Sequence, residues 1–199
     1  MVWAPGVHVN WLEEFRTVNL IVESSAETRG VDAFALSLIK AERQIRRLVT
    51  HLIYQFPCFG PSDIVRLRET LGSNRHVYFE GFVHGFDALY PRSIKELIGA
   101  EHDRLRGRLA EAINNRNKIF HGQLTSRYLT REDLLDYVND IRLWCRTLAE
   151  GALAEFGYDG FARNSFQKSQ VPELYKRFKV QQLSVDTYAD FIRQHMQRQ

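Results

Sequence analysis

The chain has 199 residues, of which 44% are hydrophobic and 26% charged, a composition typical of one globular domain with a substantial core. No apolar run approaches the length of a membrane span, the N-terminus lacks the pattern of a signal peptide, and Cys58 and Cys145 form no paired motif. We therefore expect a cytoplasmic protein without membrane segments or a disulfide framework, whose net charge of +3 permits nucleic-acid binding without requiring it.

Apolar residues at helical spacing predict the elements of the first half of the chain. A first helix is predicted over residues 11–23. A longer helix is predicted over residues 32–56, with Asp32 as its candidate N-cap and Pro57 as its stop. A short helix follows over residues 61–71.

The next segment, residues 77–89, is rich in aromatic side chains and is interrupted by Gly81 and Gly85. A short helix with close packing is the first interpretation, and an irregular connection is the second. Another long helix is predicted over residues 130–156, opening at Thr130. Its apolar residues form a seam that can pack in a bundle or against a second subunit.

A helix over residues 93–121 is opened by a capping box of Ser93 and Glu96, and Gly99 is a candidate bend. On a helical wheel its apolar residues share one face: Ile94, Ile98, Leu105, Leu109, Ala112, Ile113 and Phe120. Arg116 falls near the middle of that face. Because a charge there is costly unless it is paired or solvated, Arg116 indicates either a functional site or a buried ion pair.

The last forty residues differ from the rest. A final helix is predicted to start near Ser184, and residues 161–181 mix basic and aromatic side chains: Phe161, Arg163, Phe166, Lys168, Tyr175, Lys176, Arg177, Phe178 and Lys179. Such a stretch can follow a nucleic-acid backbone and stack bases, or it can simply wrap the helices. We expect an all-α helical bundle over residues 1–157 and an extension over residues 158–199 that packs on it.

The segment Arg116-Asn117-Lys118-Ile119-Phe120-His121-Gly122 places residue types suited to phosphodiester chemistry at a break in the helical pattern. Asn117 and His121 are four residues apart and therefore neighbours on the helix. Gly122 predicts a left-handed helix stop that would hold the imidazole at an open end. A second Arg–His pair with the same spacing, Arg46 and His51, lies inside a helical pattern with no such stop.

This motif resembles that of the HEPN superfamily, small helical domains with an Arg, a following polar residue and a His after four to six positions. Arg116, Asn117 and His121 match, and a trailing Gly such as Gly122 is common in the family. The resemblance covers residues 11–157 and implies an HEPN-like bundle. It also implies a metal-independent, homodimeric ribonuclease that acts as a toxin or antiviral effector, with an antitoxin or regulatory protein as a further partner.

RNA carries its own nucleophile, the 2′-hydroxyl, so its cleavage needs a proton acceptor and donor and a cation for the charge on the phosphate. An Arg fork suits the phosphate, and histidine suits proton transfer. We expect Arg116 to bind the phosphate, His121 to act as acid or base, and Asn117 to orient either group. Arg116 and His121 lie about 140° apart on a straight helix, so a two-fold dimer would let these groups converge.

Other interpretations remain. No cofactor motif is present, and His76 with His84, or His102 with Asp103, lacks convincing metal-ligand spacing, so we expect neither a cofactor nor a metal. The bias of 21 Arg against 6 Lys suits an RNA surface but also follows from the codon usage of a GC-rich genome. The alternative function is a catalytically silent helical dimer that serves as a binding or regulatory module.

Overall fold

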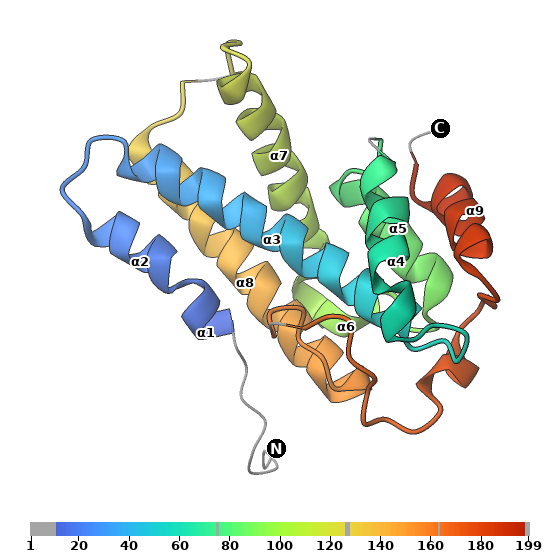
Figure 1. Ribbon diagram of the computed structural model, residues 1–199. Helices are drawn as coiled ribbons and strands as arrows, with labels where there is room; N and C mark the ends of the chain where they lie inside the picture. The colour runs from blue at the N-terminus through green and yellow to red at the C-terminus, as the bar shows by residue number, and fades with distance from the viewer. Residues whose placement is uncertain (1–10, 75, 126–127, 163, 198–199) are drawn as a thin grey trace.

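The computed structural model describes residues 11–74, 76–125, 128–162 and 164–197, and these residues form helices and connections with no β-strand. The predicted all-α fold is confirmed (Figure 1). In chain order the α-helices are α1 (Trp11–Glu14), α2 (Arg16–Glu23), α3 (Arg29–Tyr54), α4 (Ile64–Ser73), α5 (Phe79–Leu89), α6 (Ile94–Ile98), α7 (His102–Phe120), α8 (Arg131–Phe156) and α9 (Val185–His195). Short 3₁₀ turns lie at Pro61–Asp63, Gly99–Glu101 and Leu174–Arg177.

The centre of the fold is the pair α3 and α8, which lie side by side and run in the same direction (Figure 1). Gly30 at the start of α3 lies against Arg131 at the start of α8, where an added Cβ would stand 3.1 Å from the Arg131 Cγ. Midway, the buried Gln44 Nε2 donates to the Cys145 carbonyl at 2.9 Å. Helix α2 lies on one side of the α3–α8 pair, and α4, α5 and α9 lie on the other side (Figure 1).

The predicted N-cap of α3 is wrong by four residues. The helix begins at Arg29, after Thr28 rather than after Asp32. Asp32 lies inside the first turn, where its carboxylate accepts a hydrogen bond from the Thr28 hydroxyl at 2.7 Å. A carboxylate in the first turn is favourable because it faces the positive end of the helix dipole, so an acidic residue near a helix start need not be its cap.

The helix predicted over residues 93–121 is two helices. The Ser93 capping box is confirmed at the start of α6, but Gly99 has a φ of +80° and ends that helix instead of bending it. Since this φ is costly for a side chain with a Cβ, the glycine permits a change of direction between α6 and α7. The motif therefore lies on a separate helix, α7.

Residues 77–89 follow the first interpretation, with α5 packed closely against the C-terminal helix. A Cβ at Gly81 would overlap the carbonyl oxygen of Met196 and stand 2.9 Å from its carbonyl carbon. A Cβ at Gly85 would stand 2.7 Å from the Met196 Cγ. The two glycines, one turn apart on one helix face, thus let the chain after α9 approach the α5 backbone.

Much of the C-terminal segment wraps the bundle. Phe161 and Phe178 are buried in the core, and Lys168 Nζ donates to the carbonyl of Phe56 at 2.9 Å and to that of Tyr54. The Tyr54 carbonyl belongs to the last turn of α3, where carbonyls need partners outside the helix, and the Phe56 carbonyl lies just beyond that helix. Arg163, one of the basic residues of this stretch, lies outside the described residues.

Candidate functional site

A groove with a volume of about 1240 Å³ lies between α3, α5, α7 and the end of α9. Arg116, Asn117 and His121 all line it. The residues singled out from the sequence therefore face one shared, solvent-accessible space. The volume of the groove exceeds the range of about 300–1,000 Å³ that is typical of sites for drug-sized ligands.

The end of α7 explains how His121 reaches this groove. The helix ends at Phe120, and Gly122 adopts a φ of +64°, which confirms the predicted left-handed stop. The N–H of Gly122 donates to the Ile119 carbonyl at 3.1 Å and that of Gln123 to the Lys118 carbonyl at 2.8 Å. This Schellman pairing satisfies the last carbonyls of the helix and leaves the His121 side chain exposed at the helix end.

Arg116 forms an ion pair across the groove wall. Its Nη2 lies 2.6 Å from the Glu42 Oε1 of α3, and the two side chains are 23% and 34% exposed. The Arg116 Nε is buried and has no hydrogen-bond partner among the described residues. The charge that the wheel placed on an apolar face is thus both paired and partly solvated, and one of its nitrogens remains unsatisfied.

Phe120 departs from the predicted apolar face because its side chain is 64% exposed. The C-terminal end of α7 projects beyond the neighbouring helices, which agrees with this exposure (Figure 1). Asn115 shows the opposite departure: it is buried, and its Nδ2 donates to the Tyr137 hydroxyl at 3.1 Å. The helix wheel gives the direction of a side chain but not whether another element lies there.

Four further polar residues of the groove have no sequence pattern that links them to the motif. Arg46, His76, His84 and His195 line it with the motif, and they come from α3, the turn before α5, α5 and α9. Four of the seven histidines of the chain therefore face one groove, which only the tertiary fold could show. Among the described residues, no three His, Cys, Asp or Glu side chains are grouped so that they could hold a metal ion.

The second Arg–His pair has a different environment. His51 is buried, its ring stacks on Tyr158 with centroids 4.4 Å apart, and its Nδ1 lies 3.3 Å from the Ser165 carbonyl oxygen. Burial lowers the pKa of His51 to about 4. This imidazole is neutral near pH 7. It is also buried and inaccessible to a substrate, whereas the His121 side chain is exposed.

No protein-family model, curated protein or solved structure matches this chain. In the part of the chain that the structure describes, no helix has both the length and the apolar character needed to cross a membrane.

Proposed function

We propose that this protein is a metal-independent RNA endonuclease with Arg116, Asn117 and His121 in its active site. The observation that carries the proposal is that these three side chains, selected for phosphodiester chemistry, line one open groove. By analogy with the HEPN domains that the motif resembles, we propose a cytoplasmic toxin or antiviral effector that a second protein restrains.

In the proposed reaction, the 2′-oxygen of the substrate forms a bond to the adjacent phosphorus, and the bond from phosphorus to the 5′-oxygen breaks. If His121 accepts the 2′-hydroxyl proton, water protonates the leaving 5′-oxygen; if His121 donates a proton to the 5′-oxygen, water accepts the 2′-hydroxyl proton. Arg116 stabilises the charge on the non-bridging oxygens in either case. Asn117, one turn before His121, orients the imidazole or the phosphate. The products are a 2′,3′-cyclic phosphate and a 5′-hydroxyl.

We propose a two-fold dimer as the active form. Phe120 and Leu124, on either side of His121 in the chain, are 64% and 94% exposed. An interface between two α7 ends would remove these apolar side chains from water. Sedimentation velocity at micromolar concentration should show a dimer for the wild type and a monomer for Phe120→Asp combined with Leu124→Asp. A wild-type monomer would contradict the dimeric mechanism.

The ion pair between Arg116 and Glu42 favours the second candidate, a catalytically silent binding module. A half-buried Arg with a carboxylate partner has a sufficient structural reason to be present, because removing one partner of such a pair leaves an uncompensated charge. The two candidates differ in one property: only the enzyme cuts RNA.

Purified protein incubated with RNA and, separately, with DNA in the presence of a chelator tests the proposal. We expect cleavage of RNA alone, because DNA lacks the 2′-hydroxyl and no metal is required. Absence of cleavage of any RNA by folded wild-type protein would favour the silent module. Cleavage that stops on addition of the chelator would contradict the metal-independent mechanism.

A further inference from the structure

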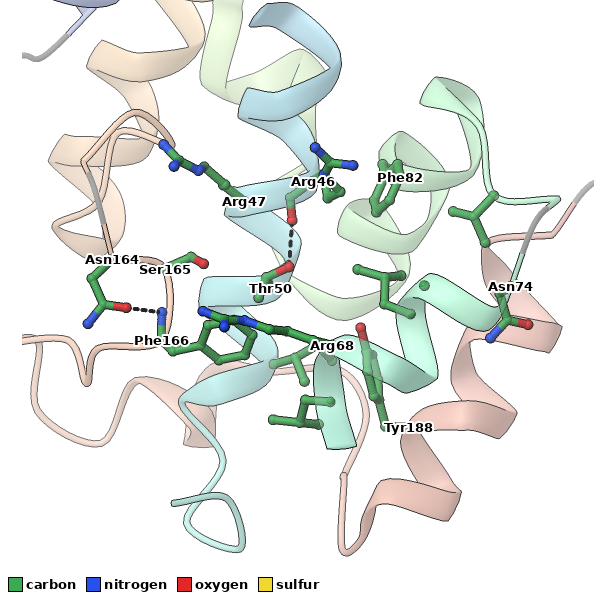
Figure 2. Close-up of a pocket in the computed structure, with 15 residues that line it drawn as sticks. Arg46, Arg47, Thr50, Arg68, Asn74, Phe82, Asn164, Ser165, Phe166 and Tyr188 are labelled. Atoms are coloured by element: carbon green, nitrogen blue, oxygen red, sulfur yellow. Dashed lines mark hydrogen bonds between the residues drawn. The ribbon is translucent and has the colours of Figure 1, made fainter. Parts of the chain in front are cut away.

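A second hollow, of about 520 Å³, lies between α3, α4 and residues 164–166 (Figure 2). Arg46 and Arg47 of α3 and Arg68 of α4 line it, and no Asp or Glu is among its lining residues. The three side chains carry positive charges, whose mutual repulsion falls when an anion binds among them. The lining therefore favours an anionic ligand. We call this space the arginine hollow.

Among the ion pairs of the described residues, none includes one of the three arginines of the hollow. The Arg47 Nη1 donates a hydrogen bond to the Phe161 carbonyl oxygen at 3.0 Å. Burial, and after it the positive charge of Arg43, lowers the pKa of Arg47. A phosphate would supply the counter-charge that these groups lack, in the geometry that guanidinium groups bind well.

An aromatic side chain lies beside the cations. Figure 2 shows Arg68 extended along the ring of Phe166, with its Cζ 4.9 Å from the ring centroid. The Phe166 ring is fixed by an edge contact with Tyr54 at 5.5 Å. Guanidinium and aromatic planes are both surfaces on which nucleic-acid bases stack. The arginine hollow thus offers groups for a phosphate and for a base.

The arginine hollow adjoins the groove. Arg46, Val77 and Phe82 line both spaces. A strand held at Arg116 and His121 can therefore pass Arg46 and enter the hollow. Its volume lies within the range of about 300–1,000 Å³ that is typical of small-ligand sites, which suits one nucleotide unit.

We propose that the arginine hollow binds one nucleotide of the RNA strand that leaves the cleavage groove, with its phosphate between Arg46 and Arg68 and its base against Phe166. The proposal rests on the proposed function, since it describes how the substrate of that site continues. A free nucleoside monophosphate has the same phosphate and base as one nucleotide of an RNA strand. The experiment distinguishes binding of the free nucleotide from binding of the strand.

Binding of a labelled single-stranded RNA to the non-cleaving His121→Ala protein provides the test, with fluorescence anisotropy measured over a range of salt concentrations. Adding Arg68→Ala is expected to weaken binding and to reduce the slope of log Kd against log salt by about 0.7, the value for one lost phosphate contact on a single strand. Phe166→Ala should weaken binding without changing this slope. The matched control is Arg66→Ala, which removes the same charge from an exposed position of α4 outside the hollow.

The outcomes separate this proposal from the proposed function. If Arg68→Ala and Arg66→Ala change the affinity and the slope equally, or if the His121→Ala protein binds no RNA, the proposal is overturned even where wild-type protein cuts RNA. If RNA binding depends on Arg68 and not on Arg66 while the wild-type protein cuts no RNA, the nucleotide site in the arginine hollow is supported and the cleavage proposal is contradicted. Arg68-dependent binding of a nucleoside monophosphate without binding of RNA would overturn the assignment to a strand.

Discussion

Replacing Arg116 or His121 with alanine is expected to abolish most RNA cleavage. Removal of one group that stabilises developing charge costs about 10²–10³-fold in rate, and loss of a general acid or base costs about 10²–10⁴-fold. We expect kcat/KM to fall by these factors for Arg116→Ala and His121→Ala, respectively. Both side chains line the groove, and neither belongs to the apolar core. The measurement is the initial rate of cleavage of a labelled RNA in the presence of a chelator.

The matched control for charge is Lys118→Ala, which removes a cation two residues from Arg116 but outside the groove lining. It should cut RNA at close to the wild-type rate. Thermal unfolding of each variant separates a lost active site from a lost fold, since Arg116→Ala also leaves Glu42 unpaired. Equal cleavage by wild type, Arg116→Ala and His121→Ala would reveal a contaminating nuclease and contradict the assignment.

Gly81→Ala is expected to give a large loss of stability. The added Cβ would overlap the Met196 carbonyl oxygen, and backbone cannot yield as a flexible side chain can, so α5 and the chain after α9 must move apart. Overpacking of this kind costs about 1–3 kcal/mol and occasionally more. The free energy of unfolding from urea denaturation, with an unchanged m-value, is the quantity to compare.

Gly107→Ala is the matched control for that substitution. Gly107 is an exposed position in α7, and an added Cβ there meets no atom within 4 Å. Because Ala is the better helix former, this variant should be more stable than wild type by about 0.5–1 kcal/mol. If Gly81→Ala were as stable as Gly107→Ala, the close packing of α5 on the chain after α9 would be wrong.

The helices could be predicted where their signals are local. Ser93, Thr130 and Ser184 each act as N-caps with reciprocal capping boxes, and Gly157 closes α8 with a φ of +77°. Caps and stops depend on side chains within one turn, so a single sequence contains them. The parallel alignment of α3 and α8 depends on contacts between residues about a hundred positions apart, such as Gln44 and Cys145, and no local pattern encodes it.

The candidate site also combines residues that are close in the sequence with residues that only the fold brings together. Arg116, Asn117 and His121 lie within six residues, so their combination was visible in the sequence. Arg46 and His195 reach the same groove from α3 and α9, and only the fold brings them there. The exposure of Phe120 was also missed, because a helix wheel cannot show that the end of α7 projects beyond its neighbours.

The chemical nature of the cut ends tests the central claim most directly. RNA is incubated with the wild-type protein in the presence of a chelator. At each cut, the upstream fragment should end in a 2′,3′-cyclic phosphate and the downstream fragment should begin with a 5′-hydroxyl. A single 2′-deoxy substitution at the nucleotide before the cut should prevent cleavage there. Fragments with 3′-hydroxyl and 5′-phosphate ends, or an undiminished cut at the deoxy position, would contradict a mechanism in which Arg116 and His121 assist the substrate's own 2′-hydroxyl.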